Sequence, residues 1–295
     1  MPELPEVETI RKALSDIVED SIIVDIQKFR DNLRFEFPKF LDKGLVNTKI
    51  VNIKRRAKYL LFELNNGYSL ISHLGMSGCW NVKKTLNQKL CDITRDKHDH
   101  FAMILKDNKN NFWLALYNDP RRFGFMLYEQ TQKLNQNKFL EKLGIEPLDD
   151  ELKGTMLYKK FIKKNISFKA ALLDQTIIAG LGNIYVCEAL WRSKISPFTK
   201  VNEFCTIIKN SEKKLQILCD NIKDILREAL MWGGSTLKDY KNIDGGTGYF
   251  QHQFAVYGKA GNNCSKCSGV IEKVMQNGRS SFFCKTCQPL LNKEI

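Results

Sequence analysis

Residues Met1–Glu6 read MPELPE, and this stretch can be either the start of a helix or a reactive N-terminus. Removal of Met1 leaves Pro2 with a free secondary amine beside the carboxylate of Glu3. An α-amino group has a pKa of about 7.7–8.0, so near neutral pH part of it is unprotonated and able to attack an electrophilic carbon. A structural explanation competes, because Pro5 suits the first turn of a helix and the glutamates suit the positive end of its dipole. Position alone favours that structural explanation, and two distant features reverse the preference.

The first distant feature is a group of four cysteines near the other end of the chain. Two Cys-x-x-Cys pairs are separated by sixteen residues, and they comprise Cys264, Cys267, Cys284 and Cys287. This spacing predicts a tetrahedral zinc site in which each pair supplies one edge. Four cysteines leave no open coordination position, so we expect one structural zinc ion. Two disulfides are the alternative, and nothing else in the sequence indicates secretion.

The residues between the cysteine pairs predict a β-hairpin. Val270–Met275 and Ser280–Phe283 have the composition of strands, and Asn277-Gly278 between them is a strong two-residue turn signal. This arrangement places Arg279 at the tip of the hairpin. The second distant feature is Lys58, which follows two arginines in the stretch KRRAKYLL of residues 54–61. Alone, Lys58 is equally explained as a solvated lysine at a strand edge.

Charge indicates the class of partner. The chain of 295 residues has 46 Lys and Arg against 33 Asp and Glu, a formal net charge of +13, which predicts a polyanionic partner. Nucleic acid is favoured over a membrane surface, because no apolar run has spanning length and no basic segment has a continuous apolar face. The acidic start also lacks the pattern of a signal peptide, so we expect a soluble protein of the cytoplasm.

The texture of the sequence changes once. From residue 21 to 129 short alternating or apolar runs are separated by turn signals, which predicts an antiparallel sandwich or barrel after one helix. The expected strands are Ile22–Phe29, Lys49–Lys54, Tyr59–Leu64, Tyr68–His73, Phe101–Leu105, Phe112–Tyr117 and Gly124–Tyr128, with the polar stretch Asn81–Asp96 as a connection. Residues 131–151 predict a connector. Helices follow it, and one predicted helical face carries Leu215, Leu218, Ile222, Leu226 and Leu230.

Two loops of the predicted sheet carry large side chains, in the stretches HLGMSG (73–78) and DPRRFG (119–124). Singly, Met76 and Phe123 suit a protein core and Arg121 suits a surface. Together they form a set able to enter a duplex, with apolar wedges to part base steps and a planar donor to meet an orphaned base. A further stretch, AGLGNIY (179–185), places Asn183 after a glycine pair at the start of a predicted helix, which suits a phosphate contact.

These motifs together resemble one family, the formamidopyrimidine-DNA glycosylases, over nearly the whole chain. The matching stretches, in order, are PELPEVET (2–9), RRAKY (55–59), HLGMSG (73–78), KHDH (97–100), DPRRFG (119–124), GNIY (182–185) and the terminal cysteine hairpin. The resemblance implies a bifunctional DNA glycosylase and lyase that excises oxidised purines, chiefly 8-oxoguanine and formamidopyrimidines. Its partner would be double-stranded DNA with oxidised purines or abasic sites, bound by a monomer that also holds one structural zinc ion.

The resemblance also implies an α+β fold. An N-terminal helix and an antiparallel β-sandwich would form a catalytic domain over residues 1–132, followed by a linker at 133–154. A helical domain with a helix–two-turn–helix element and a lesion-capping loop would cover 155–258, and a β-hairpin zinc finger would cover 259–295. The glycine-rich residues 233–249 correspond to the loop that folds over the everted base in the family.

Site residues are implied by the same motifs. Pro2 would attack the sugar C1′, Glu3 would be the acid that assists ring opening, and Lys58 would hold a phosphate and transfer a proton. Arg279, which is also implied as catalytic, and Asn183 would grip phosphates beside the lesion. Further DNA-contacting positions of the family match His98 and Lys164, together with Arg121, Met76 and Phe123.

Two alternatives stay open at this point. The endonuclease VIII type shares the terminal proline, the glutamate and the zinc finger, but it removes oxidised pyrimidines and lacks the Met, Arg and Phe set. Met76, Arg121 and Phe123 therefore favour the purine enzyme. In the other alternative the chain is a non-catalytic zinc-ribbon protein that binds nucleic acid, and Pro2 only starts a helix.

Overall fold

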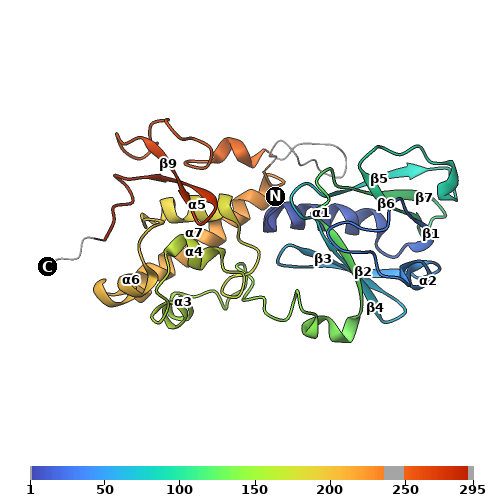
Figure 1. Cartoon of the computed structure of the whole chain (residues 1–295), viewed down its shortest axis with the longest axis horizontal. Helices are drawn as coiled ribbons and strands as arrows, with labels where there is room; N and C mark the ends of the chain where they lie inside the picture. Colours follow the sequence, from blue (N-terminus) through green and yellow to red (C-terminus); the bar gives the residue numbers. More distant parts are fainter. Residues whose placement is uncertain (1, 236–248, 292–295) are drawn as a thin grey trace. The chain divides into compact units, whose positions relative to one another are not determined.

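The computed structural model describes residues 2–235 and 249–291. The chain divides into two compact units (Figure 1). The first, here called the sandwich unit, contains the described residues of 1–141 and 232–249; the second, the helical unit, contains those of 142–231 and 250–295. Most of the glycine-rich segment expected to cover an everted base lies in residues 236–248, outside the described part of the chain.

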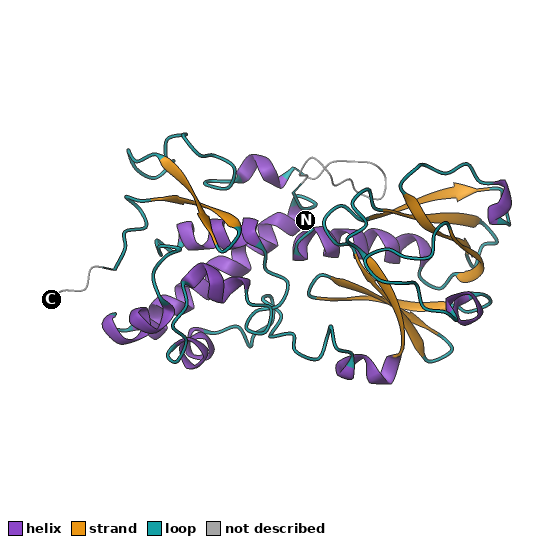
Figure 2. Ribbon diagram, in the orientation of Figure 1, coloured by secondary structure: helices purple, strands orange, loops and turns teal. Residues whose placement is uncertain are grey.

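The sandwich unit is built from two four-stranded antiparallel sheets (Figure 2). One sheet has the order β1-β6-β7-β5 and the other the order β2-β3-β4-β8. The strands of the first sheet are β1 (Ile22–Lys28), β6 (Asp99–Lys106), β7 (Phe112–Asn118) and β5 (Cys79–Thr85). Those of the second are β2 (Ile50–Arg56), β3 (Tyr59–Leu64), β4 (Tyr68–His73) and β8 (Phe125–Gln130). The antiparallel sandwich expected from the sequence is therefore confirmed.

One apolar core joins both sheets to the N-terminal helix α1 (Leu4–Val18). Trp80 of the first sheet and Phe62 of the second meet with ring centroids 5.5 Å apart. Along α1, Val7, Ile10 and Leu14 recur at helical spacing and are fully buried in this core. The short helix α2 (Leu41–Leu45) adds two more leucines to the core. Burial of one face of α1 fixes the place of the N-terminus against the sandwich.

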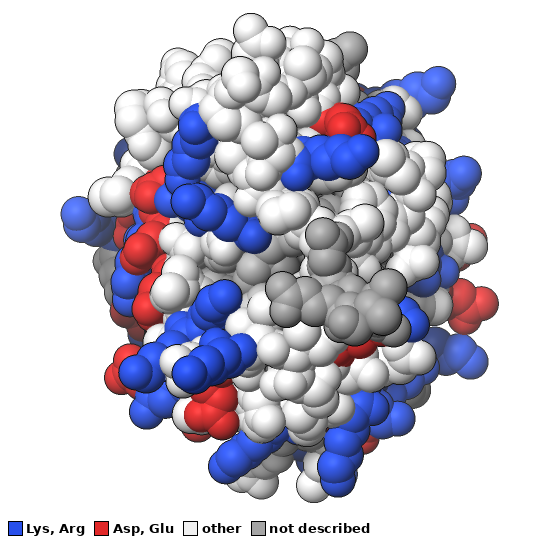
Figure 3. Space-filling model, turned by 90° about the vertical axis from the view of Figure 1, so that its left-hand side faces the viewer, with Lys and Arg blue, Asp and Glu red and all other residues white. Residues whose placement is uncertain are grey.

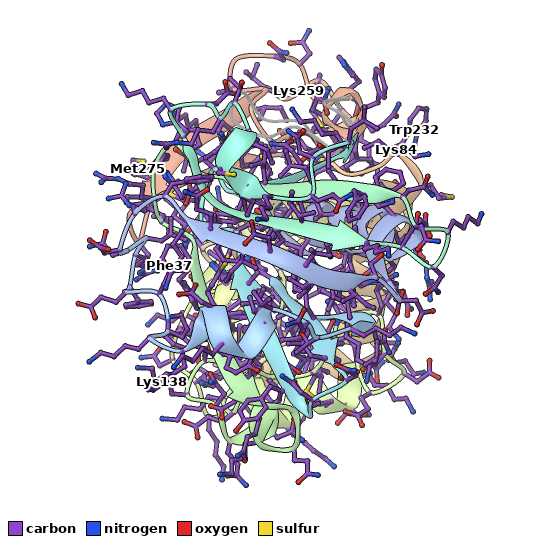
Figure 4. The ribbon with its side chains drawn as sticks, turned by 90° about the vertical axis from the view of Figure 1, so that its right-hand side faces the viewer. Phe37, Lys84, Lys138, Trp232, Lys259 and Met275 are labelled. Carbon is purple, nitrogen blue, oxygen red and sulfur yellow. The ribbon has the colours of Figure 1, made fainter. Side chains whose placement is uncertain are left out.

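Strand β5 corrects the sequence analysis, which treated residues 81–96 as a connection. The strand covers Cys79–Thr85 and pairs with β7. Its inward positions are Trp80 and Val82, but the two lysines that follow hide the alternation. Lys84, labelled in Figure 4, is exposed, and its ammonium lies 5.3 Å from the ring centroid of Trp113. The rest of the stretch is irregular except for a 3-10 turn, η1 (Leu90–Asp92).

The helical unit contains five α-helices among its described residues, as the sequence led us to expect. They are α3 (Gly154–Phe161), α4 (Phe168–Leu173), α5 (Asn183–Arg192), α6 (Val201–Ile207) and α7 (Ser211–Met231). On α7 the predicted face is confirmed, with Leu215, Leu218, Ile222 and Leu226 buried and Leu230 half-buried. Two further 3-10 helices are η2 (Thr131–Gln136), inside the expected connector, and η3 (Phe250–Gln253).

The cysteine hairpin consists of β9 (Ile271–Gln276) and β10 (Arg279–Cys284) and packs on α5. Its turn is the expected one, because Asn277 and Gly278 both have positive φ, at 52° and 74°. A buried carboxylate on α5 holds the chain that leads into the hairpin: Glu188 accepts the backbone N–H groups of Ala255, Val256 and Tyr257 at 2.8–3.0 Å. The hairpin is thus an integral part of the helical unit.

No helix in residues 2–235 and 249–291 combines the length and the apolar character that crossing a bilayer requires.

Candidate active site and nucleic-acid interface

The N-terminus is held by a carboxylate three residues away. Glu3, which is 3% exposed, is the N-cap of α1, and its backbone N–H donates to Glu6 Oε2 at 2.8 Å. The Glu3 side chain in turn accepts from the backbone of the first turn, which completes a capping box. The other oxygen of Glu6 accepts the backbone N–H and the hydroxyl of Ser235, each at 2.8 Å. One buried carboxylate therefore ties the residue after Pro2 to the start of the glycine-rich segment.

Lys58 lies at the same end of α1, which follows from how the helix runs along β2. The guanidinium of Arg11 donates to the Ile53 carbonyl at 3.2 Å, and one turn earlier Glu8 pairs with Arg55 at 2.9 Å. Helix and strand thus run in opposite directions. Strand β2 ends at Arg56, directly after Arg55, and the turn with Lys58 follows it. Because helix and strand are antiparallel, this turn lies toward the end of α1 at which the helix begins, about 7.5 Å along the helix axis from Glu8 to Glu3.

The turn between β2 and β3 has two residues, Ala57 and Lys58. Ala57 adopts φ 52°, a left-handed conformation that costs a non-glycine residue about 1–2 kcal/mol. Lys58 is 7% exposed, although a lysine at the tip of a hairpin would ordinarily extend into water. The solvated strand-edge explanation for Lys58 is therefore wrong.

His73 borders Lys58 and is held neutral. Burial, followed by the positive charges of Lys58 and Arg34, lowers the pKa of His73 to about 4. The Gly75 N–H donates to His73 Nδ1 at 3.1 Å, so the ring carries its proton on Nε2. Its faces contact Tyr59 and Phe125, with ring centroids 4.8 and 5.0 Å away. The imidazole N–H is therefore a fixed neutral donor next to two cations.

The two loops with large side chains meet inside the sandwich unit. A Cβ on Gly75 would lie 2.3 Å from the Phe123 carbonyl carbon, so only glycine permits this approach. Asp119 joins the loops by accepting the Ser77 hydroxyl at 2.6 Å and the Gly124 N–H at 2.8 Å. The backbones of the two loops are therefore fixed against each other, and the large side chains that they carry lie outside the core.

The side chains on these loops are accessible. Phe123 is 44% exposed, and the guanidinium of Arg121 lies 4.9 Å from its ring centroid. Met76 is half-buried on the facing loop, and His98, also half-buried, supplies the carbonyl that accepts the Asp119 N–H. The structure thus brings Met76, Arg121 and Phe123 together at a surface rather than in the core.

A second group of predicted residues meets in the helical unit. Asn183 Nδ2 donates to the Ser280 carbonyl at 2.9 Å, next to Arg279 on the first residue of β10. The same carbonyl accepts from Lys169 Nζ at 2.8 Å. Arg279 and Lys169 line a surface pocket of about 280 Å³. Lys164 is turned toward Asp174, with 3.6 Å between Nζ and Oδ2.

Lys169 is a residue that the sequence analysis missed. It is 1% exposed, and its ammonium also donates to the Ser281 hydroxyl at 2.7 Å. Burial lowers its pKa, and the nearby charge of Arg279 lowers it further, while Cys187 opposes the shift. Its neighbours Phe168, Ala171 and Leu172 are buried, so in the sequence it is an isolated charge in an apolar helix. That isolation was the available signal for a buried, paired lysine.

The four cysteines are arranged for one metal ion. Their Sγ atoms all lie within 4.8 Å of one another, with separations of 3.8 Å (Cys264 to Cys287), 3.5 Å (Cys267 to Cys284) and 3.4 Å (Cys267 to Cys287). A tetrahedral zinc ion with Zn–S bonds of about 2.3 Å requires sulfur atoms about 3.8 Å apart. A disulfide requires about 2.05 Å, so the arrangement excludes the two-disulfide alternative. The donor set fits a closed, structural zinc site.

Comparisons with known proteins decide the family. The sequence pattern of the formamidopyrimidine-DNA glycosylase N-terminal domain matches residues 1–126, and that of the formamidopyrimidine-DNA glycosylase H2TH domain matches 143–241. A zinc finger found in FPG and IleRS matches residues 261–290. The formamidopyrimidine-DNA glycosylase of Bartonella tribocorum is 46% identical, over 98% of this chain and 100% of that protein. The chain belongs to the formamidopyrimidine-DNA glycosylase family.

Other relatives agree. The formamidopyrimidine-DNA glycosylase of Brucella ovis is 43% identical over 98% of the chain and its own full length. The Lactococcus lactis Fpg bound to abasic-site DNA superposes with a TM-score of 0.85 at 36% identity, covering 98% of this chain and 100% of that one. The α+β fold with a zinc-binding hairpin is confirmed, and the chain is a DNA glycosylase of base excision repair that binds one structural zinc ion.

The pKa of His73 gives a prediction for stability. Because the folded-state pKa, about 4, is below the ordinary value of 6.5, the unfolded chain binds the proton more readily. The contribution of His73 to the unfolding free energy is therefore complete above pH 6.5 and is lost as the pH falls from about 6.5 to about 4. The loss amounts to about 3 kcal/mol at most.

His73→Gln should weaken the pH dependence of the unfolding free energy of the sandwich unit between about pH 6.5 and about pH 4, measured by denaturant titration. His252→Gln, which removes an exposed histidine, is the control. An NMR titration that finds His73 protonating near pH 6.5 would contradict the account.

Proposed function

We propose that this enzyme excises oxidised purines, 8-oxoguanine and formamidopyrimidines, through a Schiff base at Pro2 and then cleaves the strand by β,δ-elimination. The observation that carries the proposal is the N-terminus itself. A carboxylate fixes the backbone beside Pro2, Glu3 is buried there, and the turn with Lys58 lies at the same end of α1. A helix-start role explains the buried glutamate but requires no buried lysine, so the burial of Lys58 favours catalysis.

The proposed steps follow from these groups. After Met1 is removed, the Pro2 nitrogen attacks C1′ of an everted nucleotide, and the C1′–N bond breaks as the base leaves with a proton. Glu3 protonates the ring oxygen as the sugar opens, which leaves an iminium on Pro2. The iminium acidifies the C2′ proton, and its loss expels the 3′ phosphate. Loss of the C4′ proton from the resulting conjugated iminium then expels the 5′ phosphate. Lys58 transfers a proton in the eliminations, Arg279 holds a departing phosphate, and water then hydrolyses the iminium and releases the Pro2 amine.

Phosphate binding is assigned to both units. Asn183 stands at the first position of α5, where helix N–H groups favour an anion, and Arg279 lies on the hairpin beside it. His98, Arg121 and Lys164 are proposed as further DNA contacts, with Lys164 exchanging Asp174 for a phosphate. Lys and Arg side chains also gather in several groups over one face of the molecule (Figure 3). The charge of +13 supports a DNA partner. The enzyme is also proposed to be a monomer of the cytoplasm.

The domain limits expected from the sequence remain part of this proposal. The catalytic domain would cover residues 1–132, the linker 133–154, the helix–two-turn–helix domain 155–258 and the zinc finger 259–295.

Purine specificity rests on Met76, Arg121 and Phe123, which stand together at the surface and suit the filling of a vacated base site. One observation favours a second substrate class. A Lactococcus lactis Fpg structure that superposes with a TM-score of 0.84 at 35% identity, covering 98% of this chain and 100% of that one, contains oxidised-pyrimidine DNA. A structure of a Lactococcus lactis Fpg mutant holds Fapy-dG DNA, and a structure of MutM holds carbocyclic 8-oxo-G DNA, at TM-scores of 0.86 and 0.85. Oxidised pyrimidines are therefore a second candidate substrate.

Replacing the two N-terminal groups tests the chemistry. Pro2→Gly keeps an amine but loses the secondary one, so base release should fall strongly while binding to abasic-site DNA persists. Glu3→Gln removes a proton donor without a change of shape and should slow excision by about 10²–10⁴-fold. Asp16→Asn, which alters an exposed carboxylate on the same helix, is the matched control for single-turnover assays. Undiminished excision by Pro2→Gly would exclude Pro2 as the nucleophile.

Removing the hairpin guanidinium tests the phosphate contact. Arg279→Ala should keep its zinc and reduce the slope of log affinity against log salt by about 0.9, the effect of one lost phosphate contact. Lys273→Ala removes an exposed cation from the other strand of the hairpin and should leave the slope unchanged if only Arg279 reaches the DNA. Equal slopes for Arg279→Ala and the wild type would show that Arg279 contacts no phosphate.

The base opposite the lesion tests the purine assignment. Arg121 has donors only, so it matches the acceptor edge of an orphaned cytosine better than the amino group of adenine. The wild type should cut 8-oxoguanine much faster opposite cytosine than opposite adenine, and Arg121→Ala should flatten this ratio while slowing both reactions. Equal wild-type rates opposite the two bases, or faster removal of oxidised thymine, would instead support the pyrimidine class.

A further inference from the structure

Helix α5 and the zinc-binding hairpin share one apolar cluster. Cys187 and Trp191, one turn apart on α5, are buried in it with Ile271 and Phe282 of the hairpin and with Cys264. The loop between the first two cysteines covers Trp191 from outside, because the Lys266 ammonium lies 4.4 Å from the ring centroid of the indole. Trp191 is thus enclosed between its own helix and the metal site.

The indole N–H of Trp191 is an unusual group in this cluster. Trp191 is 5% exposed, and its Nε1 is buried without a hydrogen-bond partner among the described residues. A buried donor without an acceptor costs about 1–3 kcal/mol, so such groups are rare unless a further atom or ion is involved. Cys264 supplies a sulfur acceptor in the same buried cluster, and Lys266, two residues further along the chain, covers the indole ring.

Other donors already point at the sulfur atoms. The Lys266 N–H donates to Cys264 Sγ at 3.5 Å, and the Gly269 N–H donates to Cys267 Sγ at 3.3 Å. Four thiolates around one zinc ion carry excess negative charge, and N–H donors to the sulfur atoms offset it and fix the ligand positions.

We propose that the indole N–H of Trp191 donates a hydrogen bond to the zinc-bound thiolate of Cys264, which makes Trp191 a positioning residue for the metal site. The bond joins the zinc ion to α5. The first residue of the same helix is Asn183, whose amide holds the Ser280 carbonyl beside Arg279. The zinc ion is then connected to the phosphate-binding hairpin in two ways, through the cysteines of the hairpin and through helix α5.

The test compares two tryptophan variants of the full-length protein. Trp191→Phe keeps an aromatic ring and removes the N–H. The control, Trp80→Phe, removes a buried indole N–H that donates to Ser72 Oγ at 3.1 Å in the sandwich unit. Zinc affinity is measured by competition with a chromophoric chelator. The Trp191 variant should bind zinc about 10-fold more weakly, the lower end of the range for lost outer-shell hydrogen bonds, and the control should match the wild type.

Cobalt substitution separates a hydrogen bond from simple packing. With Co²⁺ in place of zinc, loss of an N–H···S bond raises the electron density on sulfur and should move the thiolate-to-cobalt charge-transfer band to longer wavelength in Trp191→Phe only. Unchanged affinity and an unchanged band would overturn the proposal. If Trp191→Phe does not fold, the wild type loaded with ¹¹³Cd decides: the Trp191 indole proton should shift downfield on metal binding, and an unmoved resonance would refute the bond.

Discussion

The buried carboxylate of Glu6 is the constraint on which the N-terminal site depends. One of its oxygens holds the backbone N–H of Glu3, and the other holds the N–H and hydroxyl of Ser235, all at 2.8 Å. A terminal amine on a loose chain would sample many directions, and each frozen backbone residue costs about 1–2 kcal/mol in entropy. The hydrogen bonds of the capping box offset that entropy loss when the protein folds. In the proposed mechanism the Pro2 amine is therefore held in place before any substrate binds, as positioned catalysis requires.

Both units contain charged side chains that are almost fully buried. Glu3, Glu6 and Lys58 are almost fully buried in the sandwich unit, and Lys169 and Glu188 are in the helical unit. Burial of an ion without partners is costly, so such residues mark places where a precise arrangement matters more than stability. Glu188 secures the chain entering the zinc hairpin, and Lys169 secures the strand next to Arg279. The groups proposed to react with the sugar or to bind phosphate lie next to these buried residues.

Much of this architecture could be predicted from sequence, because it depends on local spacing. The two Cys-x-x-Cys pairs predicted the metal site, and Asn277-Gly278 predicted the turn that both residues adopt with positive φ. The supporting residues could not be predicted in the same way. The contact of Glu6 with Ser235 spans 229 positions, and that of Lys169 with Ser281 spans 112. Strand β5 was missed because Lys83 and Lys84 conceal an edge strand whose inward positions are only Trp80 and Val82.

The central claim is that the oriented Pro2 amine forms the covalent bond to DNA. The most direct measurement is peptide mapping by mass spectrometry after borohydride reduction of the full-length protein on lesion DNA. The account predicts that the added mass resides on a peptide that begins at Pro2, lacks Met1 and carries the sugar on the proline nitrogen. An adduct on a lysine, such as Lys58, or a trapped protein that retains Met1, would contradict it.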